Sequence, residues 1–398
     1  MVRRDFLNYV KGLSSLACFS VASKVFAQPL MVSKGGKLGF NLTLDGFFAQ
    51  ESSEQLNGYK MAVQHINEGG GLVSEGYFSN LDGKGLLSQK VNYVIKNAGG
   101  GFSSAKRSAY DLVNNHGVQV LLGGSSSEET LAHRKVASDG SIICMDGVSH
   151  SDTCSTKSFN EMGFSLFLDN TRSAKLITKA LERDLVGPQK IFHLCANYEW
   201  SRNQKRAFDS FFNKNENWST VGKFVTGPVF DFEEAKILKE SPSIIVLNVY
   251  GEKLVQVLSK LKSSQVFQNY IKENEVSIVV PLMTSLLRDR VGHETLKGVY
   301  TSLQWEASIF KDRASKSFVN SFVKSYGKKP SEAAYIGYLQ LLSYANAVSG
   351  AKSYSAKKVR DYLLTYPNKL FSYSRHNHRS DFYGVAVKGS GSGFIKYS

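Results

Sequence analysis

The sequence of 398 residues lacks the short patterns that mark many catalytic and metal-binding proteins. It contains no Gly-x-Ser-x-Gly, His-Glu-x-x-His or P-loop pattern, and its eight histidines are scattered. The pair His376 and His378 is a weak metal signal, because no partnering carboxylate accompanies it. These absences predict a protein that is not an enzyme and that needs no metal or other cofactor.

Cysteine is also scarce, with four in the whole chain. No two of them have the CxxC or CxxCH spacing of zinc, iron–sulfur or covalent haem sites. Cys144 and Cys154 lie ten residues apart, so in an oxidising compartment they either close a small disulfide loop or remain free. Cys195 lies in an apolar segment, which indicates a buried thiol.

Long hydrophobic runs are missing too, since no segment approaches the roughly twenty apolar residues that a membrane-spanning helix needs. The formal charge is +15 at pH 7. Such a basic balance suits nucleic acid, an anionic surface or an anionic solute. Because the lysines and arginines are dispersed and form no cluster interleaved with aromatic residues, we expect a solvated basic surface and no nucleic-acid binding.

The N-terminus has the features of an export signal. Residues 2–8 (VRRDFLN) resemble the twin-arginine motif, although an asparagine ends it where a lysine is common. A short, moderately apolar stretch at residues 9–22 follows, and Val25-Phe-Ala27 supplies small residues for cleavage after Ala27. The alternatives are an uncleaved basic amphipathic helix and a lipid anchor at Cys18. We predict a twin-arginine signal peptide over residues 1–27 and a periplasmic protein.

The stretch from Asp45 to Leu72 is the one around which the chain is organised. A buried strand is expected at residues 37–44, followed by a polar loop at Gln50–Ser53 and a helix. Gly58 inside this helix costs about 1 kcal/mol against alanine, so we expect close packing there. Gly69-Gly70-Gly71 then predicts a helix end and a chain reversal.

Strands and helices alternate along the rest of the chain. This alternation predicts an α/β protein with mostly parallel sheets and helices on both faces. Further strands are expected at residues 90–96, 118–122, 141–144, 190–195, 243–248 and 276–280. Helices are expected at residues 103–116, 202–213, 252–261, 329–347 and 355–364, and residues 298–305 are expected to cross back to the first lobe.

The spacing from Gly46 through Gly58-Tyr-Lys-Met-Ala-Val-Gln-His-Ile-Asn67 to the triple glycine resembles the first helix of type I periplasmic solute-binding proteins. The chain is most similar to the leucine/isoleucine/valine- and amide-binding family, which serves ABC importers. Pro330, Tyr338 and Ala345 also fall at matching places, so the resemblance covers most of the chain. It implies two lobes, each a mostly parallel sheet with helices on both faces, joined by a multi-strand hinge.

The resemblance also implies lobe boundaries and a function. Lobe I is expected at residues 36–163 plus 303–370, and lobe II at 164–302 plus 371–398. The protein would capture a small polar solute (an amino acid, amide or small carboxylate) by hinge closure and, as a monomer, deliver it to an ABC permease in the inner membrane. The alternatives are a module that presents its solute to a membrane receptor or sensor kinase and, more remotely, an enzyme on the same fold.

In open parallel sheets ligands bind beyond the carboxyl ends of the strands, and three loops of the first lobe qualify: Gln50–Ser53, Gly123–Ser127 and Gly147–His150. Gly123-Gly-Ser-Ser-Ser127 follows a strand and precedes a helix, where hydroxyls and backbone N–H groups suit a carboxylate or carbonyl. By resemblance, Ser125, Ser126 and Ser127 bind the ligand. The same serines equally suit a helix cap, in which the partner is Glu128 or Glu129.

Other candidate site residues also come from the resemblance. Val148 and Ser149 lie on the next loop of the first lobe, whereas His150 is expected in a surface loop. In the second lobe Trp200 fits best as an aromatic that closes over the ligand; the remaining candidates are Tyr198, Tyr250 and Met283. Hinge packing is the alternative for the aromatics, and Tyr300 and Trp305 either line the pocket or pack at the crossover.

One departure from the family pattern bears on the ligand. Amino-acid binders of the family often carry an acidic residue where this chain has Pro281-Leu-Met-Thr-Ser285. A buried ammonium without a counter-charge is costly. Either Glu199 or Glu252 therefore replaces that acid, or the ligand has no ammonium group; the sequence favours an amide, urea-like or carboxylate solute.

Overall fold

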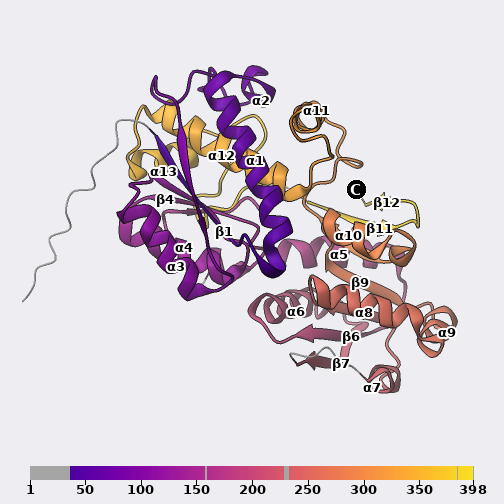
Figure 1. Cartoon of the computed structure of the whole chain (residues 1–398). Coiled ribbons are helices and arrows are strands. Elements are labelled where there is room, and N and C mark those ends of the chain that lie inside the picture. Colours follow the sequence, from indigo (N-terminus) through magenta and orange to yellow (C-terminus); the bar gives the residue numbers. More distant parts are fainter. Residues whose placement is uncertain (1–35, 157–158, 228–232, 383, 398) are drawn as a thin grey trace, which may run out of the picture. The chain divides into compact units, whose positions relative to one another are not determined.

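The computed structural model describes residues 36–397 except 157–158, 228–232 and 383 (Figure 1). The predicted signal peptide, residues 1–27, lies outside the described residues. All the described residues belong to one contact unit, Ser33–Ser398. Among them, no helix is both long enough and apolar enough to cross a membrane.

The first half of the chain alternates short strands and helices. Its elements are β1 (Lys37–Leu42), η1 (Gly46–Phe48), α1 (Ala49–Glu68), α2 (Gly71–Ser74), β2 (Asn92–Asn97), α3 (Phe102–Asn114), β3 (Val120–Gly123), α4 (Ser127–Gly140), β4 (Ile143–Asp146), η2 (Asp152–Ser155), β5 (Gly163–Phe164), α5 (Asn170–Asp184), β6 (Gln189–Ala196) and α6 (Glu199–Phe212).

The second half continues the alternation and ends in an antiparallel hairpin. Its elements are β7 (Trp218–Thr226), α7 (Glu234–Lys239), β8 (Ile244–Asn248), α8 (Glu252–Ser263), α9 (Gln265–Glu273), β9 (Ser277–Leu282), α10 (Ser285–Val291), η3 (Glu294–Leu296), β10 (Tyr300–Leu303), α11 (Arg313–Tyr326), α12 (Glu332–Ala351), α13 (Ala356–Thr365), β11 (Val385–Gly389) and β12 (Phe394–Lys396).

The strands form two sheets, which define two lobes. The first lobe has five strands in the order β2-β1-β3-β4-β5, and all its pairs are parallel. The second has seven in the order β12-β11-β10-β9-β8-β6-β7, parallel except where β11 pairs with β10 and β12. The predicted two-lobed α/β fold is therefore confirmed. The residue boundaries that we assigned to the lobes remain a prediction.

The organising helix begins earlier than its sequence predicted. Gln50–Ser53, expected as a polar loop, forms the first turns of α1, and the loop after β1 is residues 43–45. Glu51 in the first turn favours the helix, because an acidic side chain there offsets the helix dipole. The triple glycine does end the helix: Gly69 and Gly70 have φ values of 79° and 117°.

Helices α1 and α12 lie side by side against the first sheet (Figure 1). Their contact depends on Gly58, where a Cβ atom would lie 2.0 Å from the carbonyl oxygen of Ala334. No side chain fits at that distance, so the glycine lets the two backbones touch. This close approach explains the glycine in the middle of α1, as the sequence predicted.

Three crossovers join the lobes, and the side chain of Gln304 ties them together. Gln304 follows β10 and is fully buried. Its Nε2 donates to the carbonyl oxygens of Leu166 (3.3 Å) and Phe382 (3.1 Å), which lie on the other two crossovers. A backbone bridge between Ser165 and Arg379 adds a second link. The hinge is thus a set of three hydrogen-bonded segments.

The structure also tests the predictions for residues 298–305 and for the cysteines. Residues 300–303, expected as part of a crossover, form β10 in the second sheet, and Trp305 packs in the core of the first lobe. The cysteines Cys144, Cys154 and Cys195 are free and buried. The disulfide between Cys144 and Cys154 is therefore absent, and the prediction of a buried Cys195 is confirmed.

Candidate functional site

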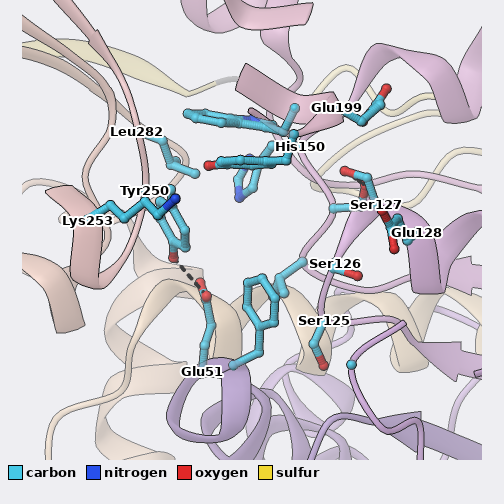
Figure 2. Close-up of a pocket in the computed structure, with 16 residues that line it drawn as sticks. Glu51, Ser125, Ser126, Ser127, Glu128, His150, Glu199, Tyr250, Lys253 and Leu282 are labelled. Atoms are coloured by element: carbon cyan, nitrogen blue, oxygen red, sulfur yellow. Dashed lines mark hydrogen bonds between the residues drawn. The ribbon is translucent and has the colours of Figure 1, made fainter. Parts of the chain in front are cut away.

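A cavity of about 390 Å³ lies where the carboxyl ends of strands from both sheets converge (Figure 2). Most of its wall follows directly on β1, β2, β3, β4, β6, β8 or β9, as expected for ligand sites in parallel sheets. The lining residues are Phe48, Glu51, Gly100, Ser125, Ser126, Ser127, Glu128, Val148, Ser149, His150, Tyr198, Glu199, Trp200, Tyr250, Lys253 and Leu282.

The structure brings most of the predicted site residues to this one cavity, namely Ser125, Ser126, Ser127, Val148, Ser149, Tyr198, Trp200 and Tyr250. Met283 does not line it. Its side chain is fully buried in the core of the second lobe, and the preceding residue, Leu282, reaches the cavity instead. Tyr300 and Trp305 are likewise core residues; Tyr300 donates from its hydroxyl to Asp184 and Trp305 donates from its indole to Ser315.

The three serines after β3 have different partners. Ser126 caps α4, since its hydroxyl accepts from the backbone N–H of Glu129. The carboxylate of Glu129 in turn accepts from the backbone N–H of Ser125 at 2.8 Å. The hydroxyl of Ser125 is buried and accepts from the backbone N–H of Thr43 at 2.9 Å. Ser127 is half-buried, and within the described part of the chain its hydroxyl accepts one long hydrogen bond, 3.3 Å, from Ser149.

This arrangement distinguishes the serine that caps α4 from the serine whose hydroxyl has the weakest partner in the fold. The cap pairs Ser126 with Glu129, which is one of the two pairings that the sequence left open, but the Glu129 carboxylate accepts from the backbone N–H of Ser125 and not from that of Ser126. The hydroxyl of Ser125 joins its loop to Thr43 after β1 and to Ser52 in α1. Ser127 is therefore the serine whose hydroxyl is least committed to the fold, and it stands at the start of α4 where the helix dipole favours an anion.

The loop after β4 is held against the serine loop by close backbone contact. A Cβ atom on Gly147 would lie 2.2 Å from the carbonyl oxygen of Gly124, so no larger residue fits. His150, expected in a surface loop, is instead buried at the cavity wall, with Nδ1 2.5 Å from the carbonyl oxygen of Leu168. Burial lowers the pKa of His150 to about 4, so its imidazole is neutral at physiological pH.

The second lobe contributes aromatic side chains. The rings of Tyr198 and Trp200 stack with centroids 6.0 Å apart, and the ring of Trp200 lies 6.2 Å from that of Tyr250. Phe48 faces them from the first lobe. Aromatic walls on two sides supply apolar contact area and negatively polarised ring faces.

Glu51 and Tyr250 meet across the cavity. The Tyr250 hydroxyl donates to Glu51 Oε2 at 2.8 Å (Figure 2). Burial raises the pKa of Glu51 to about 7, against the opposing effect of this hydrogen bond. Burial, followed by the nearby Glu51 charge, raises the pKa of Tyr250 well above its usual range, so the phenol stays protonated and donates.

The two acids suggested as replacements for the missing carboxylate are placed differently. Glu199 lines the cavity and its Oε1 accepts from Ser151 at 2.8 Å, which links α6 of the second lobe to the loop after β4. Glu252 does not line the cavity and pairs with Arg290 on the surface. Of the two, only Glu199 is in place to contact a solute.

The sequence missed several lining residues, chiefly Phe48, Glu51, His150 and Lys253. Glu51 lies in Gln50–Ser53, one of the three segments that the sequence placed beyond the strand ends, but it was not singled out there as a site residue. Lys253, whose ammonium donates to the carbonyl oxygen of Gly227, lies one residue past the start of α8, and only the fold turns it to the cavity. Among the described residues, no group of histidine, cysteine and carboxylate side chains could hold a metal ion.

Comparison with known proteins shows which family the chain belongs to. The family model for periplasmic binding proteins matches residues 36–372. The chain therefore belongs to the periplasmic binding protein family. None of the curated proteins matches the sequence.

Solved structures with the same fold include three substrate-binding or solute-binding proteins of transporters. The amino acid ABC transporter substrate-binding protein from Pseudomonas fluorescens Pf-5 is 15% identical, with a TM-score of 0.79 over 92% of this chain and 96% of that chain. The branched-chain amino acid transporter substrate-binding protein from Streptococcus pneumoniae, solved with isoleucine, is 17% identical (TM-score 0.74; 92% and 100% covered). A solute-binding protein from R. palustris, solved with benzoate, is 15% identical (TM-score 0.73; 92% and 96% covered).

Proposed function

We propose that this protein is exported, captures a small polar solute in the cavity between its lobes, and delivers it to an ABC importer. The observation that carries the proposal is the cavity itself, whose wall is built from the carboxyl ends of both sheets. Structural relatives from ABC transporters support it, because they share the fold over more than nine-tenths of the chain.

Each lobe has a distinct part in capture. Ser127, Ser149 and the backbone N–H groups at the start of α4 hold an oxygen-bearing group of the solute. Trp200 and Tyr250 of the second lobe cover its apolar part. The hydrogen-bonded crossovers around Gln304 allow the lobes to move as bodies, so that solute binding favours the closed arrangement, which the permease recognises.

A thermal-shift screen of the mature protein tests capture. The panel comprises amino acids, short amides, urea, and aliphatic and aromatic carboxylates. A solute at 100 times its Kd stabilises the folded state by about 2.7 kcal/mol, which such a screen detects. Closure is then measured by small-angle scattering and tryptophan fluorescence. A solute that calorimetry shows to bind without changing either signal would contradict hinge closure.

Export and delivery need separate tests. Mass spectrometry of the mature protein is expected to find Gln28 as the first residue; an N-terminus at Met1, or a lipid on Cys18, would contradict the signal-peptide proposal. Deleting the gene is expected to abolish uptake of the identified solute. Normal uptake, with the loss of a transcriptional response to the solute, would instead indicate a sensing module. Sedimentation is expected to show a monomer.

A further inference from the structure

The wall of the cavity contributed by α1 carries a carboxyl group that lacks a cationic partner. Glu51 is 8% exposed and lines the cavity. Among the described residues, the hydrogen bond that its carboxylate receives comes from Tyr250, a neutral phenol, and it takes part in no ion pair. Glu54, one turn further along the same helix, pairs with Lys328. Glu51 and Glu54 of the same helix thus differ: Glu54 is paired, and Glu51 faces the cavity.

A second buried acid lies behind Glu51. Glu332, in the first turn of α12, is 2% exposed, and neither carboxylate oxygen has a hydrogen-bond partner among the described residues. Burial, together with the charges of Glu51 and Glu306, raises its pKa well above the usual range. A buried carboxyl group without partners costs free energy, which a nearby positive charge would offset.

The bases near these acids are already engaged. Arg288 donates to Glu306 at 2.5 Å and to Asp289 at 3.0 Å, so its charge is shared by two carboxylates. Lys253, on the cavity wall, donates to the carbonyl oxygen of Gly227 at 3.1 Å. Lys253 keeps its charge in that contact, but among the described residues neither base forms an ion pair with Glu51 or Glu332.

Aromatic faces line the same cavity. Phe48 belongs to the first lobe, and Tyr198, Trp200 and Tyr250 to the second. Aromatic ring faces attract cations and are weakly hydrated, so a cation there keeps more of its attraction to a carboxylate than it would in water. Acid and aromatic rings together suit an ammonium group attached to an apolar body.

We propose that Glu51 is the partner of a positively charged group in the solute, so that the site takes ammonium-bearing solutes. The inference rests on the proposed function of the cavity and names its ligand class. Glu51 would thus replace the acid that is missing at Pro281–Ser285, in preference to Glu199, whose Oε1 already accepts from Ser151. It also reverses the preference for an ammonium-free solute that the sequence alone gave.

The number of protons that the protein releases or takes up when a solute binds can test this inference. With a pKa of about 7, the carboxyl of Glu51 is about half protonated at pH 7. A cation bound beside it lowers that pKa and expels about half a proton, whereas an anionic or neutral solute that excludes water causes proton uptake. Two neighbouring groups do not titrate near pH 7: the imidazole of His150 is neutral there and the phenol of Tyr250 keeps its proton. Burial, followed by the charge of Glu51, raises the pKa of Glu332, so this carboxyl also resists ionisation.

The experiment is titration calorimetry of the mature protein in phosphate and in Tris buffer at pH 7, which counts the protons. The probes are matched pairs with and without the ammonium group: L-leucine with 4-methylpentanoate, and L-phenylalanine with 3-phenylpropanoate. The ammonium-bearing member is expected to bind at least about 30-fold more tightly, since removing one partner of a buried charge pair costs that much. Its Kd is expected to fall about tenfold from pH 6 to pH 8.

The variant Glu51→Gln keeps a hydrogen-bond acceptor for Tyr250 but cannot ionise. It is expected to lose both the proton release and the 30-fold preference, whereas Glu54→Gln, outside the cavity on the same helix, keeps both. Tighter binding of the ammonium-free members, with proton uptake, overturns the inference and leaves solute capture intact. If no solute of the wider screen binds, the proposed function itself fails. The pH dependence of the unmodified protein decides the matter even if Glu51→Gln does not fold.

Discussion

The hydroxyl of Tyr250 donates to Glu51 Oε2 at 2.8 Å, and this hydrogen bond joins the two lobes across the cavity. Tyr250 follows β8 of the second sheet, while Glu51 lies in the first turn of a helix packed on the first sheet. On the far side of the cavity Ser151 donates to Glu199, again joining one lobe to the other. Cavity access and lobe separation therefore depend on a few polar contacts.

We expect Tyr250→Phe to shift the ligand-free protein toward more open arrangements. The variant loses one hydrogen bond between lobes, worth about 1 kcal/mol, which changes an open–closed ratio about fivefold. Small-angle scattering without solute is expected to show a larger radius of gyration. Tyr270→Phe is the matched control, because that hydroxyl donates to Pro242 within the second lobe. Expansion of both variants, or of neither, would contradict the bridging role.

The pH dependence of stability is expected to reveal Glu51. Below pH 4.5 its carboxyl is protonated in both the folded and the unfolded chain. Between pH 4.5 and 7 the unfolded chain ionises while the folded one resists, so the unfolding free energy falls as pH rises, by about 3 kcal/mol from this group. In urea denaturation, the unfolding free energy of the unmodified protein should therefore fall relative to that of Glu51→Gln between pH 4.5 and 7. Above pH 7 the difference between the two proteins should stay constant. Parallel curves throughout would show that Glu51 is not perturbed.

Two substitutions in the serine loop are expected to have different effects, one on the stability of the protein and the other on its affinity for the solute. Ser126→Ala removes the cap of α4 and should lower the unfolding free energy by about 1 kcal/mol. Ser127→Ala should change stability by less than about 0.5 kcal/mol but weaken solute binding about tenfold. Thermal unfolding and calorimetry on the two variants check this. The opposite assignment would mean that the capping hydroxyl also holds the solute.

Gly58→Ala is expected to destabilise the first lobe strongly. Its Cβ atom would lie 2.0 Å from the carbonyl oxygen of Ala334, so α1 and α12 must move apart, at a cost of about 3 kcal/mol. Gly140→Ala, at the end of α4, meets only Val113 Cγ1 at 3.1 Å and is expected to change stability by less than about 1 kcal/mol. Denaturation midpoints compare the two. Equal effects would show that the helix contact can relax.

The thiols give a direct test of the absent disulfide. Burial raises the pKa of Cys154 to about 12, and it raises those of Cys144 and Cys195 above their usual range. All three are buried, so they should react slowly with a thiol reagent in the folded protein. In denatured, unreduced mature protein three thiols are expected. A count of one would show that Cys144 and Cys154 are bridged after all.

Much of the fold could be predicted because it depends on local pattern. Strands β1, β3, β6, β8 and β9 are short apolar runs bounded by polar loops, and the periodicity of the longer helices is visible in one dimension. The antiparallel β11 and β12, and the partly exposed β7, escaped notice because none of them is a continuous buried apolar run; β7 and β12 are the edges of the second sheet.

The candidate site was predicted where a loop follows a recognisable strand, as at Ser125–Ser127, Val148 and Tyr250. The prediction was wrong where it depended on the direction in which a side chain points. Met283 and Leu282 are adjacent, yet only Leu282 reaches the cavity, because neighbouring residues at the end of an extended segment point to opposite sides.

The sequence by itself determined the class of the fold, the strand ends that bear the site and the glycine through which α1 packs, since each depends on a local pattern or on a single residue's sterics. Only the tertiary structure decided which acid faces the cavity. The side chains of Glu51, Glu199 and Glu252 are chemically identical. They differ in their burial and in their hydrogen-bond or ion-pair partners, which lie up to 199 positions away in the sequence. A pKa is set by desolvation and neighbouring charge, and neither exists until the chain has folded.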